Sequence, residues 1–248
     1  AVKVAMKQFR NDKTINTIIL YGDTPLIESK TLNKALSYFK KNSLDLCVLS
    51  MLPKSQQNSY GRLYFDNGIL SQIIEKIEIT KDNITKCSDL CNTGIMIFNT
   101  EKLLENIYKV KNNNKKKEYY LTDLVNIFYQ NQLKTGHFSC SEDECKGVNN
   151  MTELSSINKI FQRKKRDFYL EKGVNLIDDD SVFFSYDTKI GKNVLIQPHV
   201  FFGKGVDIGS NVIVKSFCHI ENSTIHANCT IGPFARLRDN TNIKSGTK

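Results

Sequence analysis

The last third of the chain repeats an aliphatic residue every six positions. One series runs without a break, and after a slip of one residue a second series resumes the same period: Ile190, Ile196, Phe202, Ile208, Val214 and Ile220, then Ile225, Ile231, Leu237 and Ile243. A period of six fits neither an α-helix of 3.6 residues per turn nor an alternating β-strand. It predicts a parallel β-helix, in which each hexapeptide forms one flat side of a triangular coil and its aliphatic residue points inward.

A second aliphatic set follows the first at an offset of four residues: Val194, Val200, Val206 and Val212. Three hexapeptides make one coil, so the repeat predicts roughly three coils, about the minimum for a stable stack. The sequence ends at Lys248 without a polar capping element, and an uncapped coil exposes unpaired strand edges. We therefore expect the β-helix to be incomplete at this end.

The residues before Gly173 have the pattern of an α/β domain. Short apolar runs at 15–20 and 45–52 predict buried strands, and a helix that Ser29 could cap lies between them, which is the βαβ pattern of a parallel sheet. Asp-Asn-Gly at 66–68 between two apolar runs predicts a hairpin turn. A strand is expected at 93–98, helices are expected near 102–108 and 121–129, and a long helix from Thr152 is expected to stop at Gly173.

The spacing of Val2, Ala5, Met6 and Phe9 predicts a short amphipathic helix at the start of the sequence. It has no N-cap and no preceding strand, so we interpret it as the remainder of a longer element. The predicted organisation is an α/β domain at 1–150, a linker helix at 151–173 and the β-helix at 174–248.

Composition excludes several classes of protein. The chain has 248 residues and a net charge of +9, but its basic residues form no RNP-like or helix-turn-helix pattern, so nucleic acid is not an expected partner. No apolar run approaches the roughly 18 residues of a membrane span, and no leader opens the sequence. The seven cysteines lack the neighbours of a four-ligand zinc site. Reduced thiols and a cytoplasmic location are the expectation.

The first candidate site is Tyr21-Gly22-Asp23, which directly follows the apolar run at 15–20. In open α/β sheets ligands bind outside the carboxyl ends of strands, and a carboxylate there is an oxygen ligand that Mg²⁺ shares with substrate phosphates. The tripeptide alone is weak evidence, because Gly-Asp is also a common turn.

Four further residues are candidates, and two of them, Glu75 and Asn149, have a simpler alternative. Gly61 would let backbone approach a ligand closely, and Glu75 could accept hydrogen bonds from sugar hydroxyls unless it is a surface residue of an exposed strand. The amide of Asn92 can both donate and accept. Asn149 could offer an oxygen to a metal, or else Asn149 or Asn150 simply caps the long helix.

Together these segments resemble one family. The segments that carry the resemblance occur in a fixed order before and within the hexapeptide repeat: Tyr21-Gly-Asp-Thr-Pro-Leu-Ile27, Tyr60-Gly-Arg62, Asn92-Thr-Gly94, Tyr119-Tyr-Leu-Thr-Asp123, Gly147-Val-Asn-Asn150 and Ile231-Gly-Pro-Phe-Ala-Arg-Leu-Arg238. The chain resembles, over essentially its whole length, the bacterial bifunctional N-acetylglucosamine-1-phosphate uridyltransferase/glucosamine-1-phosphate acetyltransferases.

The resemblance implies a Rossmann-like nucleotidyltransferase domain joined by a helix to a left-handed parallel β-helix that assembles as a homotrimer. In that family the first domain joins UTP to N-acetylglucosamine-1-phosphate and releases pyrophosphate and UDP-N-acetylglucosamine, a precursor of cell-wall and lipopolysaccharide sugars. The positions that match the Mg²⁺ ligands are Asp23 and Asn149. Those that match the nucleotide-sugar contacts are Tyr21, Gly22, Asp23, Gly61, Glu75, Asn92 and Asn149, with Tyr120 and Thr122 on a substrate-side loop.

The departures from the family pattern are also informative. The family's glycine-rich triphosphate loop and the basic catalytic residue after it are absent, so no catalytic set is complete in this sequence. Arg238 matches a sugar-phosphate ligand of the acetyltransferase half, but the sequence then reads Arg-Asp-Asn where the family has Arg-Pro-Gly, and the family's catalytic His and acetyl-CoA contacts lie beyond Lys248. We expect this polypeptide alone to be inactive or very slow.

Two other interpretations stay open at this stage. The chain could be a non-catalytic module whose β-helix trimerises while its α/β part is vestigial. It could also be a related sugar-1-phosphate nucleotidyltransferase of a different base or sugar specificity.

Overall fold

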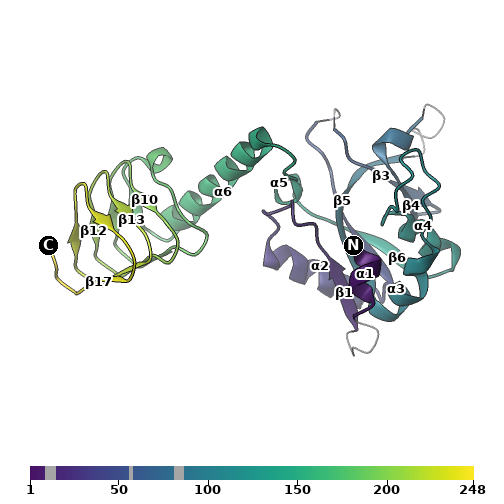
Figure 1. Cartoon of the computed structure of the whole chain (residues 1–248), viewed down its shortest axis with the longest axis horizontal. Helices are drawn as coiled ribbons and strands as arrows, with labels where there is room; N and C mark the ends of the chain where they lie inside the picture. The colour runs from purple at the N-terminus through teal and green to yellow at the C-terminus, as the bar shows by residue number, and fades with distance from the viewer. Residues whose placement is uncertain (9–14, 56–57, 81–86) are drawn as a thin grey trace. The chain divides into compact units, whose positions relative to one another are not determined.

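The computed structural model of the chain describes residues 1–8, 15–55, 58–80 and 87–248, and Figure 1 shows its elements. The chain divides into two compact units, Ala1–Glu153 and Leu154–Lys248. The first is an α/β unit and the second is a parallel β-solenoid. In the described part of the chain, no helix combines the length and the apolar character needed to cross a membrane.

A six-stranded mixed sheet forms the centre of the α/β unit. Its strands are β1 (Asn16–Ile19), β2 (Leu46–Met51), β3 (Arg62–Asp66), β4 (Ile69–Ile74), β5 (Cys87–Asn99) and β6 (Thr135–Ser139). The order is β4-β3-β5-β2-β6. Strands β3 and β1 lie on the same side of the long strand β5: β3 pairs with its first half and β1 pairs with its second half. Only β2 and β6 pair in parallel among the described strands of this sheet.

The βαβ pattern at 15–20 and 45–52 predicted the two strands and their common direction, but the sheet that contains them is mixed and not parallel. Both segments are strands, but the long strand β5 lies between them and pairs antiparallel with each. The βαβ pattern reports that two strands share a direction, and nothing in it shows that a third strand from later in the sequence is inserted between them.

Helices cover both faces of this sheet. Their bounds are α1 (Val2–Met6), α2 (Ser29–Lys41), α3 (Thr100–Asn106), α4 (Asp123–Gln130) and α5 (Glu142–Cys145), with 3₁₀ turns η1 (Lys76–Glu78) and η3 (Ile107–Lys109). Leu46 and Val48 pack on the α1, α3 and α4 side, whereas Cys47 and Leu49 pack on the α2 side. Because both faces are buried, β2 is a continuous apolar run rather than an alternating one.

Two local predictions can be compared with the structure. The hairpin is confirmed: β3 and β4 pair across Asn67 and Gly68, which both have positive φ, at 48° and 80°. The first helix is shorter than predicted, because it covers Val2–Met6 and buries Met6 but leaves Ala5 exposed. Phe9, the last residue of the predicted apolar face, lies outside the described residues.

The predicted β-helix is confirmed as a parallel β-solenoid (Figure 1). Its short strands are β7 (Asn175–Leu176), β8 (Lys189–Ile190), β9 (Leu195–Ile196), β10 (Phe201–Phe202), β11 (Asp207–Ile208), β12 (Ile213–Val214), β13 (His219–Ile220), β14 (Ser223–Ile225), β15 (Thr230–Ile231), β16 (Arg236–Leu237) and β17 (Thr241–Ile243). They form three parallel sheets. The aliphatic residues of the repeat stack in columns, for example Ile196 beside Val214 and Val214 beside Ile231.

Residues with positive φ turn the chain at the corners of each coil. Asn193, Asn211 and Asn228 occupy one corner, with φ of 53°, 58° and 63°, and their side chains hydrogen-bond in sequence. Asn tolerates this left-handed conformation better than most residues. Asparagine is therefore suited to this corner of the coil.

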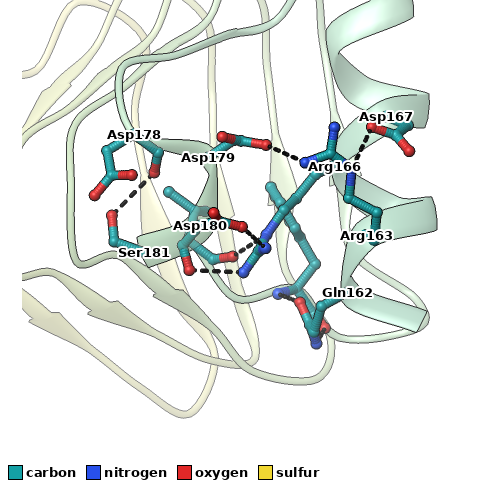
Figure 2. Close-up of polar contacts among 10 residues, drawn as sticks. Gln162, Arg163, Arg166, Asp167, Asp178, Asp179, Asp180 and Ser181 are labelled. Carbon is teal, nitrogen blue, oxygen red and sulfur yellow. Dashed lines mark hydrogen bonds and ion pairs between the residues drawn. The ribbon is translucent and has the colours of Figure 1, made fainter. Parts of the chain in front are cut away.

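Helix α6 (Met151–Glu171) packs its side chains on the first coil of the solenoid through a polar network (Figure 2). Arg166, whose side chain is 8% exposed, donates to the Val182 carbonyl, the Asp180 carbonyl and the Asp180 carboxylate at 2.7–3.1 Å. Gln162 exchanges two hydrogen bonds with the backbone of Phe184, each of 2.9 Å. These bonds satisfy backbone groups of the first coil, which has no preceding coil to pair with in this chain.

Candidate functional site

A cavity of about 700 Å³ opens in the α/β unit. This volume is in the range of small-molecule sites, roughly 300–1,000 Å³. Among its lining residues are eight of those proposed from the sequence as ligands: Tyr21, Asp23, Gly61, Glu75, Asn92, Tyr120, Thr122 and Asn149. Segments that are more than a hundred residues apart in the chain therefore meet around one space.

Tyr21 and Asp23 belong to a tight turn that follows β1. The hydroxyl of Thr24 donates to the Tyr21 carbonyl at 2.9 Å and closes the turn. The Tyr21 ring lies over Gly94, where a Cβ atom would come within 2.3 Å of the ring. Burial, with the nearby charges of Glu75 and Asp23, raises the pKa of the Tyr21 phenol, so its hydroxyl stays protonated and can donate to a ligand.

The Asp23 turn lies against the segment that precedes α6. The Val148 amide donates to the Asp23 carbonyl at 2.9 Å. A Cβ atom on Gly147 would lie 3.9 Å from the Asp23 carboxylate, so this carboxylate borders the 147–149 segment. Asp23 and Asn149 thus line the cavity from two adjacent loops.

The structure separates the roles of the two neighbouring asparagines. The Asn150 side chain accepts a hydrogen bond from the Glu153 amide at 2.9 Å, so Asn150 is the residue that caps α6. The Glu153 carboxylate accepts from the Asn149 backbone amide at 2.6 Å and from the Asn149 side-chain nitrogen at 3.2 Å, so it holds the residue that precedes the cap. The bond from the side chain uses the nitrogen of the Asn149 amide and leaves its oxygen for another partner.

The donor set at Asp23 and Asn149 fits a magnesium ion that is shared with a substrate. Mg²⁺ is commonly held by one or two carboxylates together with substrate phosphates and water, and an amide oxygen is a suitable hard ligand. Within the described ranges, no three His, Cys, Asp or Glu side chains group as metal ligands. A cation here would therefore depend on oxygens from a bound anion to complete its coordination.

Glu75 lies on the cavity wall and is held by a buried threonine. The Thr122 hydroxyl donates to the Glu75 carboxylate at 2.8 Å instead of capping α4. The other carboxylate oxygen is close to Gly61, where a Cβ atom would lie 3.2 Å from it. Glu75 is half-buried and directed at the cavity, so the alternative of a surface residue on an exposed strand does not describe it.

Asn92 borders the cavity from the middle of β5. Its side-chain oxygen accepts from the Gly94 amide at 2.9 Å, and its backbone amide donates to the Gly61 carbonyl at 2.8 Å. The bond to Gly94 leaves the side-chain NH₂ group to donate elsewhere. Asn92 and Gly61 are thus fixed to each other on the cavity wall.

Two of the residues proposed from the sequence lie elsewhere. Gly22 is in the same turn as Asp23 but does not line the cavity, and a Cβ atom there would meet nothing within 4 Å. Arg238 is an exposed residue of the solenoid, directly after β16.

Two cavity residues, Lys3 and Cys145, were not predicted from the sequence. Lys3 donates to the Val110 carbonyl at 3.1 Å, and its ammonium lies 4.3 Å from the centroid of the Tyr119 ring. Cys145, treated above as an ordinary thiol, also lines the cavity. No spacing in the sequence connects Lys3 with Val110, because the two residues are 107 positions apart.

Comparisons with known proteins agree with this architecture. Residues 187–222 match the family model described as "Bacterial transferase hexapeptide (six repeats)". A protein named "Bifunctional protein GlmU" from Wolbachia pipientis wMel is 38% identical over 250 residues, which cover all of this chain and 56% of that relative. Proteins of the same name from Paramagnetospirillum magneticum and Zymomonas mobilis are 39% and 34% identical, over 97% and 99% of this chain and 52% and 54% of theirs.

The chain is a homologue of these GlmU proteins. The match extends over both units, so the relationship expected from the ordered motifs is confirmed. The chain spans about half the length of the GlmU relatives it matches.

Proposed function

We propose that the α/β unit is the sugar-nucleotide-binding part of a Mg²⁺-dependent uridyltransferase, which joins UTP to N-acetylglucosamine-1-phosphate and releases pyrophosphate and UDP-N-acetylglucosamine. The observation that supports this proposal best is the position of Asp23 and Asn149 on adjacent loops of one cavity. The GlmU relatives support the assignment to nucleotidyl transfer.

Each residue of the cavity has a role that its chemistry allows. Asp23 and the Asn149 oxygen would hold Mg²⁺, which when bound neutralises phosphate charge during phosphoryl transfer. Glu75, fixed by Thr122, would accept hydrogen bonds from sugar hydroxyls, and the Asn92 NH₂ group would donate to the sugar or its acetamido oxygen. Because Gly61 has no side chain, it would leave room for the ligand between Glu75 and Asn92.

Binding of UDP-N-acetylglucosamine, measured by isothermal titration calorimetry on the 248-residue chain with and without Mg²⁺, tests the proposal. We expect Mg²⁺-dependent binding that Asp23→Asn weakens at least tenfold, because the substitution removes a charge and keeps the shape. Asp89→Asn is the control, since Asp89 is an exposed residue outside the cavity. Equal weakening by both variants, or binding that does not depend on Mg²⁺, would count against the site.

Activity is a second measurement on the same chain. We expect pyrophosphate release to be absent or very slow, because the triphosphate loop and the basic catalytic residue of the family are not in this sequence. Loss of such groups is expected to remove several kcal/mol of transition-state stabilisation, at about 1.4 kcal/mol per tenfold in rate. Robust turnover by the chain would show that our assignment of roles is wrong. Competition by other nucleotide sugars would identify a different base or sugar specificity.

The solenoid is proposed to assemble as a homotrimer. Exposed aromatic rings stack along it in a ladder of His199, Phe217 and Phe234, with centroids 5.0 and 5.1 Å apart. All three residues have positive φ, which is unusual for bulky side chains, and Phe234 is 73% exposed. Sedimentation of the chain should show a trimer that Phe217→Ser with Phe234→Ser weakens. Intact trimers without any nucleotide-sugar binding would favour the alternative of a non-catalytic assembly module.

Arg238 is proposed to contact the sugar phosphate of an acetyltransferase reaction that uses acetyl-CoA in the longer family members. It is exposed on the solenoid, where an anion can reach its guanidinium. We expect no acetyl transfer from this chain alone, because the family's catalytic His and acetyl-CoA contacts lie outside its sequence.

A further inference from the structure

Two thiols lie side by side at the edge of the cavity. The sulfur atoms of Cys140 and Cys145 are 3.1 Å apart. Cys140 follows β6 directly, and Cys145 is the last residue of α5. Cys145 is buried and lines the cavity, whereas Cys140 is half-buried.

The two thiols differ in their readiness to lose a proton. The hydrogen bond between the two sulfur atoms lowers the pKa of the Cys140 thiol, while the same bond and burial raise the pKa of the Cys145 thiol. The thiolate is the reactive form of cysteine. Cys140 is therefore the nucleophile of the pair, and Cys145 is a neighbouring thiol that can react with it in a second step.

We propose that Cys140 and Cys145 are a redox-active dithiol that a hydroperoxide converts to an intramolecular disulfide, and that this disulfide weakens ligand binding in the cavity; the second half rests on the function proposed above. In the first step the Cys140 thiolate attacks the hydroperoxide, breaks its O–O bond and becomes a sulfenic acid, with water or an alcohol as the leaving product. In the second step the Cys145 sulfur displaces the hydroxyl group from the sulfenic sulfur as water. Two thiols are oxidised and one hydroperoxide is reduced.

A disulfide in this position would move the wall that holds Asp23 and Asn149. A disulfide bond is about 2.05 Å long, so the two sulfur atoms must approach by roughly 1 Å. Cys145 is two residues before Gly147, whose backbone borders the Asp23 carboxylate, and the next residue, Val148, donates to the Asp23 carbonyl. Displacement of this short connection shifts Asn149 relative to Asp23.

The other thiols of the α/β unit are less suited to this chemistry. Cys47 is fully buried in the apolar core, and burial raises its pKa to about 12. Burial also raises the pKa of Cys87 and of Cys91, and for each of them this effect outweighs the opposing charge of Arg62. Only for Cys140 among these four does the surrounding structure lower the pKa.

Mass spectrometry of the full chain tests the first half of the proposal. The reduced chain is treated with a small excess of hydrogen peroxide, alkylated and digested without reduction. We expect the loss of two hydrogen atoms and a cross-linked peptide that joins Cys140 to Cys145. Cys140→Ser and Cys145→Ser should each abolish the cross-link, whereas Cys87→Ser should retain it. A chain whose Cys140 and Cys145 both stay alkylatable, or whose first disulfide joins other cysteines, overturns the proposal.

Calorimetry with UDP-N-acetylglucosamine and Mg²⁺ tests the second half. Displacing Asn149 relative to Asp23 separates the two oxygens proposed to hold Mg²⁺, so we expect affinity to fall at least tenfold on oxidation and to return with dithiothreitol. The Cys140→Ser variant, whose site lies outside the cavity lining, should bind normally before and after peroxide. If the disulfide forms and the affinity is unchanged, the effect on the cavity is refuted. If the reduced chain binds no ligand, the proposed function fails, while the cross-link still decides the dithiol chemistry.

Discussion

The solenoid and the α/β unit place their interacting side chains at very different distances along the chain. In the solenoid, contacts recur at 17 or 18 residues, as between Asn211 and Asn228 or between Asn193 and Asn211. In the α/β unit, the bonds that shape the cavity join residues 47 and 107 positions apart, from Thr122 to Glu75 and from Lys3 to Val110. A regular spacing can be recognised in a sequence, but an isolated long-range pair cannot.

The two units also differ in how tolerant they should be of change. Each solenoid coil contacts only its neighbours, so its stability is close to a sum of coil and interface terms. The cavity is formed by several loops, and neighbouring loops are connected by only one or two hydrogen bonds, as from Thr122 to Glu75 and from Val148 to Asp23. Single substitutions in each unit test this difference.

Replacing an inward aliphatic residue should destabilise the solenoid strongly. Ile196 is fully buried, so Ile196→Ala should cost about 2–5 kcal/mol. Ile213, on the neighbouring strand, is 38% exposed, and Ile213→Ala should cost less than about 1 kcal/mol. Hydrogen exchange of the amides of β7–β12 reports this free energy for the solenoid by itself. Similar losses for the two variants would show that the six-residue period does not define the core.

The first coil of the solenoid should depend on single side chains of α6 more than the later coils depend on any one residue. Arg166→Ala removes three hydrogen bonds of a side chain that is 8% exposed, and we expect it to cost about 2–4 kcal/mol. Arg163, also drawn in Figure 2, pairs with Asp167 and Asp179 but is 59% exposed, so Arg163→Ala should cost about 0–1 kcal/mol. Exchange rates in residues 176–184 measure both. Equal effects would show that Arg166 is not an anchor of the coil.

In the α/β unit, Gly94→Ala should disturb the cavity through Tyr21. The new methyl group would lie 2.3 Å from the Tyr21 ring, and the position has φ of +83°, so we expect a cost of about 2–3 kcal/mol and weaker ligand binding. Gly68→Ala is matched in backbone, with φ of +80° and open space around it, and should cost about 1 kcal/mol. Urea unfolding measures the loss of stability, and calorimetric titration measures the loss of ligand affinity. Normal ligand affinity in the Gly94 variant would show that the Tyr21 ring is not part of the site.

The smallest effect concerns pH. Burial lowers the pKa of His137, whose ring hydrogen-bonds the Ser50 hydroxyl at 2.9 Å. The unfolded chain therefore binds a proton more readily, with a pKa near 6.5, so the contribution of the neutral ring is complete above about pH 6.5 and is lost as the pH falls below it. Urea midpoints at pH 7.5 and 5.5 should differ more for the wild type than for His137→Gln. An identical pH dependence in both would contradict this assignment.

The separation along the chain between interacting residues determines which features could be predicted from the sequence. The solenoid, the hairpin at Asn67-Gly68 and the buried strand β2 were predictable because each is written in contiguous or periodic residues. Family resemblance allowed Asp23 and Asn149 to be named together. The insertion of β5 between β1 and β2, the contact of Tyr21 with Gly94 and the pairing of Cys140 with Cys145 were not predictable, since each depends on how separate segments pack in three dimensions.

The most direct test of the binding site is crystallographic. Crystals of the chain with UDP-N-acetylglucosamine and Mn²⁺ in place of Mg²⁺ would locate the cation by its anomalous scattering. We predict one strong peak in the cavity, bonded to the Asp23 carboxylate, the Asn149 side-chain oxygen and a phosphate oxygen of the ligand. A bound ligand whose manganese contacts neither Asp23 nor Asn149 would contradict the account.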